Sequence, residues 1–259
     1  MKAVILAGGL GTRLMEETRY KPKPMVEVGG YPLLWHIMKI YSHYGINDFV
    51  ICLGYKGEVI KDYFYNYKMR KSDFRIDLQS GSCSILQSNA EDWKISLVDT
   101  GDETMTGGRL KRVREYLGDE TFCFTYGDGL SDIDIAAELA FHRHHGRAAT
   151  VATIRQPSGF GVLASDENGI ATHFVEKPLM ESARINGGFF ILEPSVLNYI
   201  SGDSCVWEDD PMKKLVANGE LAVFEHKGFW KACDTLRDKD QLEKLWVGKA
   251  PWRVWDRNI

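Results

Sequence analysis

The charged residues best suited to chemistry stand in loops that follow short apolar runs. The first such loop, at 8–13 (G-G-L-G-T-R), follows an apolar run at 3–7 and contains three glycines and an arginine. Glycines allow a ligand to approach the backbone closely and leave its N–H groups exposed. Because an arginine adds positive charge, this combination favours the binding of an anion such as a phosphate.

Two familiar phosphate-binding motifs do not fit this loop. A Walker A loop requires a lysine after its last glycine, and here Gly11 is followed by Thr12 and Arg13. The dinucleotide motif G-x-G-x-x-G also fails, because the glycines fall at positions 8, 9 and 11. Taken alone, the loop could therefore be no more than a tight turn.

Three other segments place charged groups in comparable positions. Asp128 stands in a G-D-G turn after the apolar run at 121–125, and Lys23 lies in the segment K-P-K-P-M. A simple turn and a solvated lysine are the structural alternatives. Flanking prolines stiffen Lys23, as a lysine that must meet one phosphate requires. The segment E-K-P at 176–178 sets a carboxylate beside a lysine that is followed by a proline.

Composition excludes several classes of protein. The chain has 259 residues, 44% of them hydrophobic, and a net charge of −4, which argues against a general nucleic-acid or membrane-surface binder. No apolar stretch approaches the ~20 residues that span a bilayer. The five cysteines form no C-x-x-C pair, so neither a disulfide framework nor a zinc site is indicated. We expect a cytoplasmic protein that binds neither nucleic acid nor membrane.

Strand and helix patterns alternate along the chain and must position these loops. Short apolar runs predict strands at 3–7, 49–53, 121–125, 149–154 and 186–192. Helical spacing predicts helices at 32–45, 58–68, 107–117, 133–145, from 194, at 211–218 and at 238–246. Alternation at 75–98 predicts hairpins outside the main sheet, and 159–175 predicts antiparallel strands joined at Asn168-Gly169.

This order of elements predicts an α/β fold. Fully apolar strands that alternate with helices form a Rossmann-like, largely parallel mixed sheet with helices on both faces. The hairpins would add a small β excursion. Because no linker or repeat interrupts the chain, we expect a single domain over 1–259. Ligands of such sheets bind beyond the carboxyl ends of the strands, where the glycine loop and Asp128 should meet.

The N-terminal block resembles the signature of the sugar-phosphate nucleotidylyltransferase family. That signature, L-A-G-G-x-G-T-R-L followed by K-P, matches the chain at 6–14 and 21–25, and G-G-Y-P-L follows at 29–33. The resemblance covers almost the whole chain. It implies the nucleotide-diphospho-sugar transferase fold, with about 1–130 binding the nucleotide and about 150–235 binding the sugar phosphate.

The resemblance also implies roles for individual residues. The glycine loop would wrap the triphosphate, Arg13 would neutralise the departing pyrophosphate, and Lys23 would hold the α-phosphate. Asp128 would bind Mg²⁺ together with Asp234, which could otherwise be the N-cap of a short turn. The catalytic residues would be Arg13, Lys23, Asp128 and Asp234. The nucleotide-binding residues would be Leu6, Ala7, Gly8, Gly9, Leu10, Gly11, Thr12, Arg13, Lys23, Thr104, Gly108, Arg109 and Gly127.

The remaining matches concern the sugar phosphate. In the segment E-K-P, Glu176 would accept hydrogen bonds from sugar hydroxyls and Lys177 would bind the sugar's phosphate. Asn186 would contact the hexose. An acceptor for hydroxyls beside a cation for phosphate is what a hexose 1-phosphate requires.

The stretch at 99–110 indicates which nucleotide is used. Thymidylyl and uridylyl members carry a glutamine and a P-x-G-L-A motif there, whereas this chain reads D-T-G-D-E-T-M-T-G-G-R-L. The stretch resembles the cytidylyl-transferring branch, which implies CTP and glucose 1-phosphate as substrates and CDP-glucose for dideoxyhexose or O-antigen polysaccharide synthesis. Relatives are hexamers or tetramers, so the resemblance implies a homo-oligomer, with a hexamer as the specific expectation.

Two alternatives remain open. The first is a uridylyl- or thymidylyltransferase of the same family. The second is a non-catalytic subunit that senses nucleotides, which would be expected to lose parts of the site. Because Arg13, Lys23, Asp128 and Asp234 are all present, we expect an enzyme.

Overall fold

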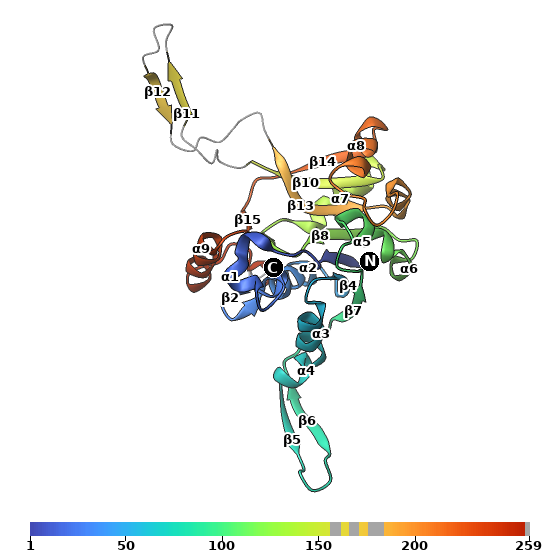
Figure 1. Ribbon diagram of the computed structural model, residues 1–259, viewed down its shortest axis with the longest axis vertical. Coiled ribbons are helices and arrows are strands. Elements are labelled where there is room, and N and C mark those ends of the chain that lie inside the picture. The colour runs from blue at the N-terminus through green and yellow to red at the C-terminus, as the bar shows by residue number, and fades with distance from the viewer. Residues whose placement is uncertain (156–161, 166–170, 176–183, 257–259) are drawn as a thin grey trace.

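A mixed sheet forms the centre of the computed structural model, which describes residues 1–155, 162–165, 171–175 and 184–256. Within these residues the sheet has seven strands in the order β14-β10-β13-β8-β1-β4-β7 (Figure 1). The strands are β1 (Ala3–Leu6), β4 (Asp48–Leu53), β7 (Lys94–Asp99), β8 (Phe122–Tyr126), β10 (Ala149–Ile154), β13 (Ile185–Leu192) and β14 (Leu221–His226). Only β13 runs antiparallel to its neighbours in this sheet. The predicted largely parallel mixed sheet is confirmed.

Helices cover both faces of the sheet, as predicted. One face carries α2 (Leu33–His43), α3 (Gly57–Tyr65), α7 (Ile135–His145) and α9 (Leu236–Val247), and the other carries α5 (Thr106–Arg112), α6 (Arg114–Leu117) and α8 (Asp210–Ala217). Successive residues of a strand point to opposite faces. Ala3 and Ile5 of β1 therefore join one apolar cluster while Val4 and Leu6 join the other. Burial on both faces explains why the strands read as continuous apolar runs.

Several predicted helices differ from the structure at capping positions. The helix expected at 58–68 is divided at Asn66 into α3 and α4 (Tyr67–Arg70). At this division the side-chain amide of Asn66 donates a hydrogen bond to the backbone carbonyl of Asp62. The helix expected from 133 begins at 135, since the Asp134 side chain accepts the N–H of Ala137 as an N-cap. The helix expected at 107–117 is divided at the buried Val113.

Short pairs of strands lie outside the central sheet. The hairpin of β5 (Ser72–Ile76) and β6 (Cys83–Ser88) projects from the body, which confirms the predicted excursion for this part of 75–98 (Figure 1). The prediction is wrong for residues 94–98, because they belong to β7, which pairs with β4 in the central sheet. β11 (Val162–Ser165) pairs antiparallel with β12 (Ala171–Val175) as expected, and the predicted turn at Asn168-Gly169 lies outside the described residues. None of the helices described is long and apolar enough to cross a membrane.

Two further strand pairs and a short helix complete the part near the glycine loop. They are α1 (Met15–Thr18), β2 (Glu27–Val28) with β3 (Tyr31–Pro32), and β9 (Gly129–Ser131) with β15 (Trp230–Ala232). Because β1, β4, β7 and β8 are parallel, the loops that follow them lie at the same edge of the sheet.

Candidate active site

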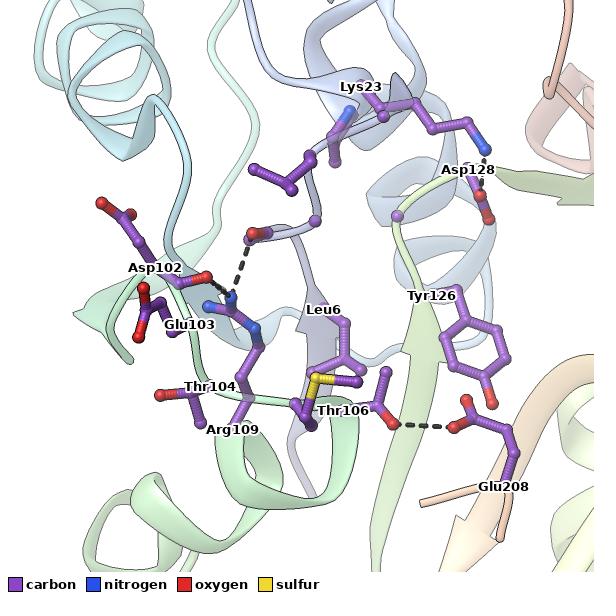
Figure 2. Close-up of a pocket in the computed structure, with 17 residues that line it drawn as sticks. Leu6, Lys23, Asp102, Glu103, Thr104, Thr106, Arg109, Tyr126, Asp128 and Glu208 are labelled. Carbon is purple, nitrogen blue, oxygen red and sulfur yellow. Dashed lines mark hydrogen bonds and ion pairs between the residues drawn. The ribbon is translucent and has the colours of Figure 1, made fainter. Parts of the chain in front are cut away.

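A cavity of about 790 Å³ lies at this edge of the sheet (Figure 2). Ten of the residues expected at the site line it: Leu6, Gly8, Gly9, Leu10, Gly11, Lys23, Thr104, Arg109, Gly127 and Asp128. Seven further residues also line it: Pro24, Asp102, Glu103, Met105, Thr106, Tyr126 and Glu208. Four of them, Asp102, Glu103, Met105 and Thr106, lie in the stretch at 99–110 that the sequence linked to the nucleotide. The structure therefore gathers the loops after β1, β7 and β8 around one space.

Some expected residues lie outside the lining. Ala7 is buried and continues the pairing of β1 with β4 through its N–H, while Thr12 and Arg13 are exposed at the end of the glycine loop. Gly108 faces the 203 loop, since a Cβ there would lie 2.4 Å from the Asp203 carbonyl oxygen. Glu176 and Lys177 lie outside the described residues.

The glycine loop packs closely against its neighbours at two positions. A Cβ at Gly8 would lie 2.1 Å from the Arg109 Nη1 and 2.9 Å from the Gly54 N atom. Gly11 has a φ of 62°, in the left-handed region that favours glycine. At Gly9, by contrast, a Cβ would meet no atom within 4 Å, so the space above it is open to a ligand.

Arg109 of α5 connects the loops that follow β1, β4 and β7. Its buried guanidinium donates to the carbonyl oxygens of Leu53 (2.9 Å), Gly8 (3.0 Å) and Asp102 (3.1 Å) and to the Thr100 hydroxyl (2.8 Å). Burial lowers the pKa of the guanidinium, and neighbouring acidic groups oppose that effect. Arg109 therefore fixes the loops after β1, β4 and β7 relative to one another.

A lysine and two carboxylates meet at the other end of the cavity. The Lys23 ammonium, on a side chain only 11% exposed, bonds to Asp128 and lies 2.6 Å from Asp234 Oδ1. Arg13 Nη2 lies 3.0 Å from the same Asp234 oxygen. Burial alone would lower the pKa of Lys23, but the two carboxylates outweigh it and the pKa is raised. The ammonium is thus held charged where a phosphate could reach it.

The pairing of β9 with β15 brings these two carboxylates together. Cys233, directly before Asp234, donates its N–H to the carbonyl of Asp128 at 2.9 Å. Thr235 is the N-cap of α9 and forms a capping box with Asp238. Because Thr235 caps this helix, the alternative that Asp234 serves as a helix cap is wrong.

The geometry of this pair fits a divalent metal ion. Both carboxylates reach one ammonium nitrogen, so their oxygens converge on a single cationic position. Mg²⁺ is commonly held by one or two carboxylates, with phosphate oxygens and water as the other ligands. No group of three or more His, Cys, Asp or Glu side chains suited to a metal occurs among the residues the structure describes. A metal here would therefore need further ligands from water or from a bound phosphate.

A third corner of the cavity carries neutral and acidic oxygens. Figure 2 shows Tyr126, Thr106 and Glu208 away from both Lys23 and the Asp102–Thr104 side. Asn186, near Tyr126 at the start of β13, uses its Oδ1 to accept the N–H of Gly188 (2.8 Å). Tyr126 could have been found from sequence, because it ends an apolar strand directly before the G-D-G turn. Glu208 stands between two elements and carries no such signal.

Comparisons with known proteins agree with this arrangement. Residues 2–235 match the family model described as Nucleotidyl transferase. The glucose-1-phosphate cytidylyltransferase of Salmonella typhi is 55% identical over 99% of this chain and 100% of that protein. A probable glucose-1-phosphate cytidylyltransferase of Bacillus subtilis (strain 168) is 46% identical over 98% of this chain and 100% of that protein.

Solved structures share the fold at low identity. HddC from Yersinia pseudotuberculosis has a TM-score of 0.70 and 22% identity over 95% of this chain and 99% of that chain. UDP-glucose pyrophosphorylase complexed with UDP-glucose has a TM-score of 0.69 and 20% identity, covering 96% of this chain and 98% of that chain. At such identities the likeness supports the architecture alone.

Proposed function

The chain belongs to the nucleotidyl transferase family, and we propose that it transfers the cytidylyl group of CTP to glucose 1-phosphate, giving CDP-glucose and pyrophosphate. The proposal is supported by the high identity to proteins of that name over nearly the whole chain. Relatives named for other reactions, such as a mannose-1-phosphate guanylyltransferase subunit and a UTP–glucose-1-phosphate uridylyltransferase, are only 31% and 32% identical. The choice of nucleotide therefore follows the closer group of relatives.

The observation that best supports a nucleotidyl transfer is that Lys23 and Arg13 contact two carboxylates beside the glycine loop. A phosphate oxygen of the sugar phosphate attacks the α-phosphorus of CTP. A new P–O bond forms while the bond to the pyrophosphate oxygen breaks. The attacking oxygen is already an anion, so the step requires neither a general base nor a covalent intermediate.

The chain's own residues bring two anions together and neutralise charge. The N–H groups of the glycine loop bind the triphosphate, Lys23 holds the α-phosphate, and Arg13 neutralises the pyrophosphate as it leaves. Asp128 and Asp234 would hold Mg²⁺, which when bound supplies further positive charge at the phosphates. Glu176, Lys177 and Asn186 bind the glucose 1-phosphate.

The base is recognised at the Asp102–Thr104 side of the cavity. Cytosine presents an acceptor at N3 and an amino donor at position 4, the reverse of uracil and thymine. Thr104 is a buried residue, 7% exposed, and its hydroxyl can both donate and accept a hydrogen bond. Together with backbone groups at 104–108, it provides adaptable partners for cytosine, while Arg109 holds the loops on this side of the cavity in place.

The protein also assembles as a homo-oligomer, with a hexamer as the specific expectation. Support comes from the projecting β5–β6 hairpin, which exposes apolar side chains that a second copy could cover (Figure 1). These are Phe74, Ile76, Leu78, Ile85 and Leu86. Light scattering after size-exclusion chromatography tests the expectation of a hexamer.

A cytoplasmic location is proposed with the activity, because nucleoside triphosphates are made in the cytoplasm. A role in polysaccharide synthesis is proposed with the same activity.

Product analysis tests the proposed function. Purified protein, MgCl₂, CTP and glucose 1-phosphate should yield CDP-glucose and pyrophosphate in equal amounts, by ion-exchange chromatography and a coupled pyrophosphate assay. Omission of the sugar phosphate should abolish pyrophosphate release. Binding of CTP with no product in the complete mixture would support the nucleotide-sensing alternative instead.

A further inference from the structure

The corner of the cavity formed by Tyr126, Thr106 and Glu208 has a chemistry of its own. Glu208 contributes a carboxylate and Tyr126 a phenol, and cationic side chains lie elsewhere among the residues that line this cavity (Figure 2). A carboxylate repels phosphate, so this corner does not suit the anionic parts of the substrates. It suits a group that offers hydrogen-bond donors.

Glu208 is held in place by the residue that precedes it. Trp207 is fully buried and packs edge-on against Phe124 of β8 and Phe190 of β13, with ring centroids 5.8 and 5.9 Å apart. The backbone N–H of Trp207 donates to the Thr106 hydroxyl oxygen at 2.9 Å. The same hydroxyl donates to Glu208 Oε2 at 2.7 Å. Glu208 is therefore an exposed carboxylate on a rigid mount, with one oxygen bonded to Thr106 and the carboxylate next to the Tyr126 hydroxyl.

Tyr126 supplies a buried hydroxyl without a hydrogen bond of ordinary geometry in the described part of the chain. Its ring lies against Gly188 of β13, where a Cβ would approach the ring to 2.7 Å. Burial raises the pKa of the phenol, and Glu208 raises it further, while Asn186 acts in the opposite sense. The hydroxyl therefore stays protonated, and Glu208 and Asn186 are polar neighbours.

A sugar hydroxyl satisfies both groups at once, because it can donate to a carboxylate and accept from a phenol. The substrates contain two sugars, the ribose of the nucleotide and the hexose of the sugar phosphate. Asn186 next to Tyr126 favours the hexose, since Asn186 belongs to the proposed sugar-phosphate site. The ribose remains the competing source of the same chemistry.

We propose that Glu208 determines sugar specificity by accepting a hydrogen bond from a hydroxyl of the bound hexose, with Tyr126 contacting the same sugar. This inference rests on the proposed use of glucose 1-phosphate. It adds a specificity-determining residue that the signature motifs do not contain. Loss of a hydroxyl partner from a built polar site typically costs about tenfold or more in kcat/KM.

The test pairs the variant Glu208→Ala with deoxy substrates. We expect the wild type to lose about tenfold or more in kcat/KM on one of the 2-, 3-, 4- or 6-deoxy forms of glucose 1-phosphate. Glu208→Ala should lose a similar factor on glucose 1-phosphate and lose nothing further on that deoxy form. Glu208→Gln, which retains an acceptor, should show a partial effect. Glu103→Ala, a carboxylate on the opposite side of the cavity, should keep the wild-type preference among the sugars.

Two outcomes would overturn the proposal. If wild type and Glu208→Ala lose the same factor on every deoxy sugar, Glu208 acts only through Thr106. If the lost discrimination appears between CTP and 2′-deoxy-CTP instead, the contact is to ribose. A wild type that makes no CDP-glucose would refute the proposed function. Calorimetric binding of glucose 1-phosphate and its deoxy forms to both proteins would then still decide whether Glu208 reads a hexose hydroxyl.

Discussion

At the scale of one residue, the ion pairs of Lys23 show how positive and negative side chains neutralise one another at the site. Its ammonium stands between Asp128 and Asp234, and Arg13 neutralises the same Asp234 oxygen. Two positive and two negative groups thus balance one another locally. A bound nucleotide brings phosphate charge that Lys23 and Arg13 can meet only if the carboxylates find another cation. Such an exchange would link nucleotide binding to the binding of the proposed metal ion.

Asp128→Asn should abolish most activity while leaving the fold intact. The amide keeps the size of the carboxylate but removes the charge that would hold Mg²⁺, so we expect a fall in kcat of about 10²–10³, or ~3–4 kcal/mol. Steady-state kinetics with circular dichroism measure both parts. Asp62→Asn, an exposed carboxylate paired with Arg70, is the matched control and should behave as wild type. Full activity of Asp128→Asn, or of the wild type in excess EDTA, would contradict the metal assignment.

The two lysines of the proposed site should fail in different ways. Lys23→Met should chiefly impair the use of CTP, whereas Lys177→Met should chiefly raise KM for glucose 1-phosphate, because each lysine is proposed to bind a different anion. Initial rates with each substrate varied in turn separate the two effects. Equal defects toward both substrates in both variants would show that the division of the site is wrong.

Glu138 makes stability depend on pH. Its side chain is fully buried, both carboxylate oxygens lack a partner among the described residues, and burial raises its pKa from 4.5 to about 8. The folded state therefore favours the protonated form. The free energy of unfolding should be highest below pH 4.5 with respect to this group. It should fall by up to ~1.4 kcal/mol per pH unit as the pH rises toward 8.

Urea denaturation from pH 5 to 8.5 measures this effect against Glu138→Gln. The variant should lack the decline and be more stable than wild type by several kcal/mol at pH 8.5. Glu115→Gln, an exposed position of α6, should retain the wild-type slope. Parallel curves for wild type and Glu138→Gln would show that the carboxyl is not protonated in the folded protein.

At the scale of elements, the glycine loop contains one glycine that is packed against protein atoms, Gly8, and one that faces open space, Gly9. Gly8→Ala would place a methyl group against Arg109 and Gly54, so we expect a loss of about 1–3 kcal/mol of stability. Gly9→Ala meets no protein atom, so it should fold normally and raise KM for CTP instead. Urea denaturation and CTP kinetics on both variants measure this contrast. Indistinguishable behaviour of the two variants would contradict a ligand position above Gly9.

Sequence reasoning located the loops of the site because parallel strands end at one edge of a sheet. The apolar runs before Gly8 and Asp128 identified two such ends, and the structure places both at one cavity. The contact of Asp234 with Lys23 needed the β9–β15 pairing, which local patterns do not contain. Glu208 reaches the cavity through the burial of Trp207, a tertiary contact that no spacing in the sequence encodes.

At the scale of the whole molecule, one sheet joins both halves of the chain. β13, from the part expected to bind the sugar phosphate, pairs with β8, from the part expected to bind the nucleotide. Tyr126 at the end of β8 thereby meets Gly188 of β13. The single-domain organisation stays a prediction, but this pairing shows how a nucleotide and a sugar phosphate could share one cavity.

Selectivity among nucleotides tests the account most directly. The measurement is kcat/KM for CTP, UTP, dTTP and GTP at saturating glucose 1-phosphate and Mg²⁺. We predict the highest value for CTP, with UTP and dTTP lower because a site whose partners mismatch the base leaves buried polar groups unpaired. A rigid site can reach about 10⁴ in such discrimination, and the adaptable Thr104 hydroxyl should give less against UTP. A UTP value equal to or above that of CTP would contradict the cytidylyl assignment.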